Sequence, residues 1–120
     1  MSKNPGLNAQ EVTFLKWGRH FRLPGGSKLI VGRDEKENKI ISSLARPSDN
    51  ILTVEDVPGP TSIMTGSDPA DIELAASITV SYSDAEDNQP YRVILRIHGK
   101  KKLIQVRGRP KADFAHLMVN

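Results

Sequence analysis

The sequence predicts an α+β fold, a single small domain in which a mostly antiparallel sheet carries two helices on one side. Its 120 residues, 38% of them hydrophobic and 26% charged, suit one globular core. Apolar and polar residues alternate from Tyr91 to His98, as in a half-buried strand. Two segments with the helical spacing of apolar residues, one after Asp34 and one after Asp68, interrupt the strand-like segments.

The first half of the chain is predicted to form a hairpin and a helix. Residues 1–10 are polar and aperiodic, so we expect a flexible N-terminal arm there. An apolar-rich stretch runs to a Pro-Gly-Gly turn at 24–26 and returns over 28–32. Asp34 is expected to cap the helix that follows, with Glu37 completing a capping box.

Two more strands and the second helix are predicted in the middle of the chain. A strand at 51–54 leads to a turn in which Pro58 and Gly59 suit the two central positions of the type II geometry. Proline has the fixed φ of the first position, and glycine can adopt the positive φ of the second. A short apolar return at 62–64 precedes the helix, for which residues 68–71 supply the cap candidates.

The end of the chain is predicted to form a closing hairpin. The alternating segment 91–98 is followed by Gly99 and three lysines, which are expected to make the turn. The return strand is expected at 103–106. The tail from Arg109 is short and is expected to hold one helical turn.

Charge is distributed unevenly along the chain. Residues 1–33 contain six Lys and Arg against one acid, residues 34–88 three against twelve, and residues 89–120 eight against one. If the two basic ends meet in the fold, they form a positive face suited to a polyanion. The alternative is that basic and acidic segments neutralise each other on neighbouring elements.

The composition argues against several kinds of chemistry. With no cysteine, the chain has no disulfide, no thiolate nucleophile and no Cys-based zinc site, which suits a reducing compartment. Motifs of nucleotide-binding loops, zinc proteases and serine hydrolases are absent, and the three histidines lack ligand spacing. No secretory signal is visible, and no segment reaches the about 18 apolar residues of a membrane span. We therefore expect a cytoplasmic protein that is not an enzyme and holds neither metal nor cofactor.

The candidate binding residues are cations and aromatic side chains suited to a phosphate backbone. Arg33 is predicted at a helix N-terminus, where free N–H groups favour an anion unless the Asp34 carboxylate already occupies them. The aromatic residues of the segment 16–22 are equally suited to the core, and lysines at a hairpin turn are common on surfaces. The candidates are Lys16, Trp17, Arg19, His20, Arg22, Lys28, Arg33, Arg96, Lys100, Lys101, Lys102 and Arg107.

Three blocks of sequence, at 18–38, 54–66 and 73–85, resemble the NFACT-R type of RNA-binding domain. The resemblance is greatest to the variant at the C-terminal end of thiouridylase-like PP-loop ATPases that thiolate tRNA. It implies an NFACT-R-like domain over 11–120. Those domains often have a histidine and an acid before the Pro-Gly turn, where this chain has Thr-Val-Glu-Asp at 53–56. The motif residues, expected to be structural, are Asp34, Asn38, Asp56, Pro58, Gly59 and Pro60.

The resemblance implies a non-catalytic RNA-binding module, with tRNA as the expected RNA. Because the catalytic PP-loop half is absent, the partner would be a separate PP-loop tRNA-thiolation enzyme. The alternative is a protein-interaction domain that docks a partner subunit without RNA contact, through its acidic middle or an exposed sheet edge. The placement of the cations discriminates between them: a shared face favours RNA, and dispersal among acids favours protein.

Overall fold

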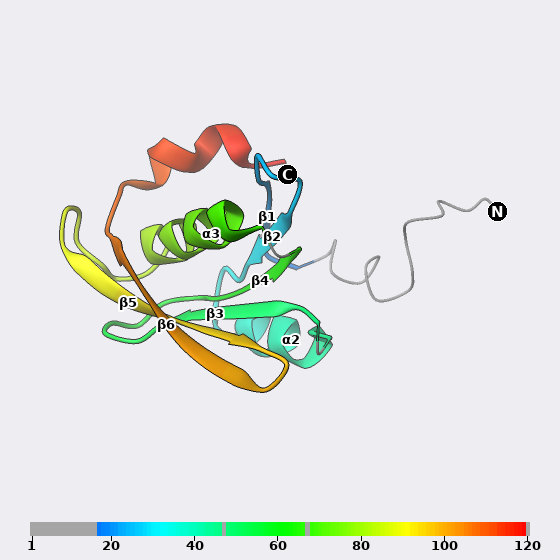
Figure 1. Cartoon of the computed structure of the whole chain (residues 1–120). Helices are drawn as coiled ribbons and strands as arrows, with labels where there is room; N and C mark the ends of the chain where they lie inside the picture. Colours follow the sequence, from blue (N-terminus) through cyan, green and yellow to red (C-terminus); the bar gives the residue numbers. More distant parts are fainter. Residues whose placement is uncertain (1–16, 47, 67, 120) are drawn as a thin grey trace.

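A single sheet organises the molecule. In the computed structural model, which describes residues 17–46, 48–66 and 68–119, six strands lie in the order β1-β2-β4-β3-β5-β6 (Figure 1). Every neighbouring pair is antiparallel, which confirms the predicted kind of sheet. The strands are β1 (Arg19–Arg22), β2 (Lys28–Val31), β3 (Asn50–Val54), β4 (Thr61–Thr65), β5 (Pro90–Ile97) and β6 (Lys100–Arg107).

Two α-helices cover opposite faces of this sheet. Helix α3 (Pro69–Ser81) lies on one face and α2 (Glu35–Leu44) on the other, so the prediction of both helices on one side is wrong (Figure 1). The reason lies in β2, which is apolar on both sides. Its Leu29 packs in the cluster beneath α3, whereas Ile30 packs beneath α2. A strand with two apolar faces must be covered twice.

The larger core lies between the sheet and α3. The small side chains of Ala75 and Ala76 are fully buried and let the helix approach the strands closely. A buried polar contact joins the helix to β4, where the Thr79 hydroxyl donates to Ser62 Oγ at 2.8 Å. The smaller core on the opposite face is built around Ile41 and Ile63.

Side-chain caps fix where both helices begin. Asp34 Oδ1 accepts a hydrogen bond from the Glu37 N–H at 2.8 Å, as the capping-box pattern predicts. In a regular capping box the Glu37 carboxylate would accept from the N–H of the cap residue Asp34. Here it accepts from the N–H of the preceding residue, Arg33. At α3, Asp68 Oδ1 accepts from the Ala70 N–H at 2.9 Å. Both aspartates predicted at helix N-termini therefore act as caps.

Two turns differ from the sequence-based expectation. Gly59 does not have a positive φ, so the type II turn at Pro58 and Gly59 is wrong. The residue is small for another reason: a Cβ there would lie 2.6 Å from the Ser83 Cβ. The β5–β6 turn consists of His98 (φ 52°) and Gly99 (φ 76°), the geometry of a two-residue hairpin. Lys100–Lys102 therefore begin strand β6 and do not form the turn.

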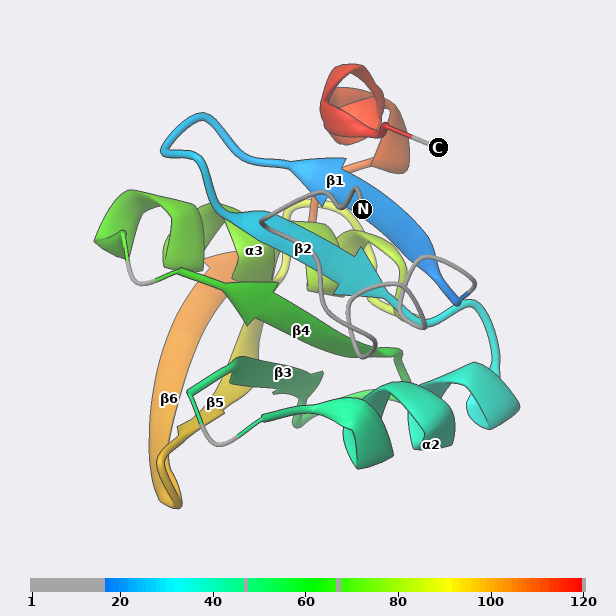
Figure 2. The same cartoon turned by 90° about the vertical axis from the view of Figure 1, so that its right-hand side faces the viewer.

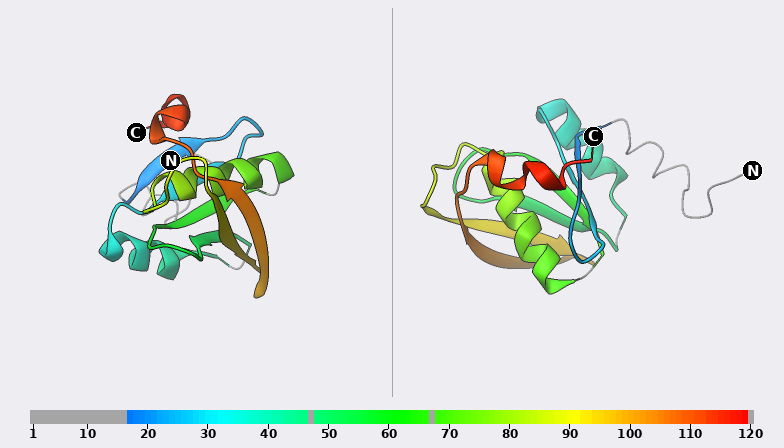
Figure 3. Two further views of the ribbon diagram at one scale, coloured as in Figure 1. Left: turned by 90° about the vertical axis from the view of Figure 1, so that its left-hand side faces the viewer. Right: turned by 90° about the horizontal axis from the view of Figure 1, so that it is seen from above.

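The C-terminal segment returns across α3 to the first strand. A 3₁₀ helix, η1 (Lys111–Leu117), crosses above α3 and buries Phe114 in the larger core (Figure 3). Beyond it, Met118 pairs with Phe21, and the Val119 N–H donates to the His20 carbonyl at 2.8 Å. This tail covers the edge of β1. Within the described part of the chain, no helix is long and apolar enough to cross a membrane.

Candidate nucleic-acid interface

The predicted cations do not all lie on one face: two regions of the described structure concentrate cations, and the remaining candidates lie elsewhere. Strands β1 and β6 are the two opposite edges of the sheet. Arg19 and Arg22 on β1 are therefore distant in the strand order from Lys100–Lys102 on β6. The predicted cations of β1 and β6 therefore do not share the single positive face that would have favoured RNA most directly.

The first region is the half of the sheet that α2 leaves open. Helix α2 packs on β4, and the β5–β6 hairpin curves away beyond it (Figure 2). Register places Arg96 opposite both Ile51 and Lys101, so these three share the α2 side of the sheet. The next pair of opposed residues on that side of β5 and β6 is Ile94 and Leu103. We call this surface the open sheet face; its residues are Arg92, Ile94, Arg96, Lys101, Leu103, Gln105 and Arg107.

Two cations on the open sheet face lack an acidic partner. Arg96 and Lys101 are directly opposite each other and exposed, and neither is in an ion pair among the described residues. Like charges at such positions destabilise a sheet unless an anion offsets them. Leu103 beside them is 50% exposed, so the cations flank an apolar patch. This combination suits a chain of phosphates with attached bases.

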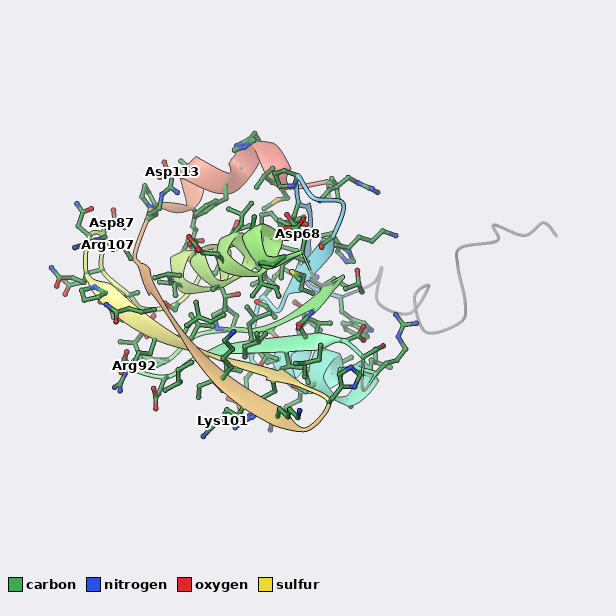
Figure 4. The ribbon with its side chains drawn as sticks, viewed as in Figure 1. Asp68, Asp87, Arg92, Lys101, Arg107 and Asp113 are labelled. Atoms are coloured by element: carbon green, nitrogen blue, oxygen red, sulfur yellow. The ribbon has the colours of Figure 1, made fainter. Side chains whose placement is uncertain are left out.

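Other cations on the same face already have partners. Arg92 Nη2 lies 2.7 Å from Asp56 Oδ1, and its Nε lies 3.3 Å from Glu55 Oε2. The hydrogen bonds from Arg92 hold the pKa of the Asp56 carboxyl below its usual range. Arg107 Nη1 donates to the Asn88 carbonyl at 2.8 Å. Figure 4 shows Arg92 and Lys101 on the side of the sheet opposite Asp68 and Asp113. Asp56, expected to be structural, ties the β3–β4 loop to β5.

The second region is a pocket of about 250 Å³ at which the three resembling blocks of sequence meet. The first block contributes the start of α2, the second the residues before β4, and the third the end of α3. The first block also contributes the β1 cation Arg19, and one cation from outside the blocks, on η1, completes the wall. We call it the motif pocket; it is lined by Arg19, Gly32, Arg33, Asp34, Glu35, Asn38, Gly59, Pro60, Tyr82 and Lys111.

A buried carboxylate positions Arg33 in the motif pocket. The Glu37 side chain is 8% exposed and lies 2.7 Å from Arg33 Nη2 through Oε2. Its Oε1 also accepts from the Arg33 backbone N–H and from Nε, both at 2.9 Å. The hydrogen bond from the Arg33 side chain is the main cause that lowers the pKa of Glu37 to about 2, against the opposing effect of burial. Arg33 is thereby fixed with its side chain 49% exposed.

Two glycines and an asparagine shape the pocket wall. Asn38 Oδ1 accepts from the Thr61 N–H at 3.0 Å and so joins α2 to β4. A Cβ at Gly32 would clash with that Asn38 oxygen, which explains why glycine is needed before Arg33. The Pro58 carbonyl accepts from the Asp84 N–H at 2.9 Å, which holds the loop before β4 against the end of α3. Asn38 and Pro58 thus join neighbouring elements through hydrogen bonds, and Gly59 packs against Ser83, which differs from the turn geometry predicted for Pro58 and Gly59.

Tyr82 holds two cations at the pocket. The Arg19 guanidinium lies 4.8 Å and the Lys111 ammonium 5.1 Å from the centre of its ring. Phe21 packs edge-on against the same ring at 6.0 Å and anchors it to the core. Lys111 was not among the predicted contacts, because no local signal in the sequence marks it. Tyr82 could have been found, because it belongs to the third resembling block.

Several predicted contacts have other positions. Lys16 lies outside the described residues. Trp17 is half-buried against the smaller core, and His20 is buried, with Nε2 3.0 Å from the Trp17 carbonyl, so these two predicted RNA contacts are core residues. Arg22 and Lys28 are exposed opposite each other at the far end of the β1–β2 hairpin. Lys100 and Lys102 share the α3 side of the sheet, away from Lys101.

Fold and surface together define a small α+β domain with two concentrations of cations, and each includes cations that have no acidic partner among the described residues, as expected of a polyanion-binding module. The family described as "NFACT protein RNA binding domain" matches residues 18–118. The chain therefore belongs to this family of RNA-binding domains, and the predicted NFACT-R resemblance is confirmed. The link to PP-loop thiolation proteins stays a prediction.

One solved structure with a similar fold is the C-terminal part of the fibronectin/fibrinogen-binding protein from Streptococcus suis. The TM-score is 0.73 at 16% sequence identity, over 85% of this chain and 50% of that chain. At this identity the likeness shows the fold alone. The chain thus spans about half the length of the solved relative. Comparison with curated proteins gives no match.

Proposed function

We propose that this chain is a non-catalytic module that holds tRNA on its open sheet face. It works in the cytoplasm beside a separate PP-loop enzyme that thiolates the bound tRNA. The observation that carries the RNA-binding part is the opposed pair Arg96 and Lys101, which has no acid partner among the described residues and adjoins the exposed Leu103. Family membership supports RNA as the ligand class. The choice of tRNA and of the partner enzyme is supported by the resemblance of the three sequence blocks.

The physical basis of binding is electrostatic. A phosphate between Arg96 and Lys101 removes the repulsion of two like charges and releases counterions from the RNA. An apolar side chain such as Leu103 offers the neighbouring base or ribose a surface to pack on. The open sheet face can therefore hold a backbone without reading a particular sequence.

A second candidate function is docking of a protein partner at the free edge of β6. This strand pairs with β5 and lies at the end of the strand order, so its outer edge offers main-chain groups for strand addition. Three consecutive lysines begin the strand. Lysines on an edge strand oppose such pairing between chains, which favours the RNA function over this one.

The test is the binding of bulk tRNA, followed by fluorescence anisotropy at several salt concentrations. Affinity is expected to fall steeply between about 50 and 200 mM salt, because phosphate contacts release counterions. The variant Arg96→Gln/Lys101→Gln is expected to lower the slope of log affinity against log salt by about 1 to 2. The matched control is Arg22→Gln/Lys28→Gln, which removes the same charge at the other end of the strand order.

Two results would contradict the proposal. Wild-type affinity that does not change with salt would show that phosphate contacts do not drive binding. Equal loss of binding in the two double variants would show that only net charge matters and that the open sheet face has no special role.

A further inference from the structure

Most residues that line the motif pocket have a structural role. Asp34 caps α2, and Gly59 gives room to Ser83. Glu35 lies 3.4 Å from Lys39. The fold does not account in the same way for Arg19 and Lys111, whose side chains make no hydrogen bond or ion pair in the described residues beyond their contacts with the Tyr82 ring.

The two cations at Tyr82 carry positive charge that the protein leaves unbalanced. Both lie within about 5 Å of one ring centre, at 4.8 and 5.1 Å. The attraction of an aromatic face for an exposed cation is weak, so it leaves the charge of both side chains available to a ligand. An anion in the pocket that Arg19 and Lys111 both line would be attracted by both and could use them as charge-assisted donors.

The pocket also offers hydrogen-bond donors that the protein does not use. Glu37 occupies Nε and Nη2 of Arg33, which leaves Nη1 without a partner in the described structure. The Asn38 side-chain amide uses only its oxygen, which accepts from the Thr61 N–H. The Nδ2 group of Asn38 is therefore likewise available as a donor. Several side chains with unused donors that line one cavity of about 250 Å³ are typical of a site for a tetrahedral oxyanion.

The acids at the pocket restrict the size of the ligand. Asp34 and Glu35 line the same cavity as the cations. They would repel a stretch of several phosphates that followed the wall, whereas one phosphate beside Arg19 and Lys111 meets mainly positive charge. The balance of positive and negative charge at the pocket therefore favours a single phosphate group.

We propose that the motif pocket is a binding site for one phosphate group of the bound RNA. Arg19 and Lys111 supply the charge, Arg33 Nη1 and Asn38 Nδ2 supply hydrogen bonds, and the Tyr82 ring lies beside both cations. This inference rests on the proposed RNA-binding function and adds a specific site to it. The same chemistry would also accept the phosphate of a free mononucleotide, and the experiment separates these sources.

The first arm measures tRNA binding by the full chain carrying Arg19→Gln/Lys111→Gln. Affinity is expected to fall about tenfold, with the salt slope lower by about 1, as for the loss of one phosphate contact. Because neither side chain bonds the protein, the variant is expected to melt within a few degrees of wild type. If it does not, Lys111→Gln alone, on an exposed residue, serves in its place. Arg22→Gln/Lys28→Gln again controls for net charge.

The second arm records ¹H–¹⁵N spectra of the wild type during titration with inorganic phosphate and with AMP. Shifts of the Gly32 amide and the Asn38 side-chain amide are expected with both ligands, and they should be absent in the double variant. Saturation by either ligand at low concentration, together with tRNA binding unaffected by the variant, would assign the pocket to a free nucleotide and overturn the RNA-phosphate proposal.

The arms also distinguish failure of the pocket from failure of the function. If Arg96→Gln/Lys101→Gln weakens tRNA binding but the pocket variant behaves like wild type, RNA binding stands and the pocket proposal is wrong. If wild-type protein does not bind tRNA at all, the proposed function is wrong. In that case the titration decides whether the pocket takes phosphate, and spectra without shifts would remove the site altogether.

Discussion

Replacing Glu37 with glutamine tests how the motif pocket is built. The change keeps the shape of a side chain that is 8% exposed and removes its charge. An amide oxygen can still accept from the Arg33 N–H, but the charge-assisted contact with the guanidinium, 2.7 Å in the wild type, is lost. We expect a loss of stability and an Arg33 side chain that is no longer fixed at the pocket.

The pKa of Glu37 sets the size of the effect. Folding lowers it from 4.5 to about 2, which corresponds to at most about 3 kcal/mol of stability at neutral pH. Because Arg33 is 49% exposed, water screens the pair, and we expect about 2 kcal/mol. The folded-state pKa is the lower one, so this contribution is complete above pH 4.5 and disappears as the pH falls toward about 2.

Urea denaturation followed by circular dichroism, at pH 7, 5, 3 and 2, measures this contribution. Glu37→Gln is expected to be about 2 kcal/mol less stable than wild type at pH 7, with Tm lower by about 5–10 °C. The difference should shrink below pH 4 and vanish near pH 2. Glu35→Gln is the matched control, since that side chain is 85% exposed and its contact with Lys39 should contribute less than about 0.5 kcal/mol. A difference for Glu37→Gln that is the same at every pH would refute the charge-based reasoning.

Two further substitutions test the packing of the pocket wall. Gly59→Val is expected to lose about 1–3 kcal/mol in the same assay, because its Cβ would lie 2.6 Å from the Ser83 Cβ; stability within error of wild type would show that the loop moves freely. Asn38→Ala is expected to lose about 1–2 kcal/mol by leaving the Thr61 N–H without its acceptor. Asn38→Asp keeps that acceptor and should be less destabilised, so equal losses would contradict the role of this bond.

Local chemistry explains which elements could be predicted. An aspartate before an apolar helical repeat competes for the first free N–H groups wherever the helix lies, so Asp34 and Asp68 indicated the two helix starts correctly. Alternation of apolar and polar residues indicated the β5 strand correctly, because successive side chains of a strand point to opposite faces wherever the strand lies in the sheet. The prediction of a type II turn at Gly59 was wrong because a glycine can be required either for a positive φ or for close packing. Here it is close packing, and the residue that needs the space, Ser83, is far away in the sequence.

The sequence by itself determined the antiparallel α+β class, the helix caps and the family to which the chain belongs. The tertiary structure set the strand order, which places the cations of β1 and those of β6 at opposite edges of the sheet. It also decided that α2 covers only part of one face, and that the C-terminal segment returns to β1. These arrangements depend on which apolar faces bury one another across long stretches of chain, and local periodicity does not encode that. For this reason Arg19, Tyr82 and Lys111 meet at one pocket only in the folded molecule.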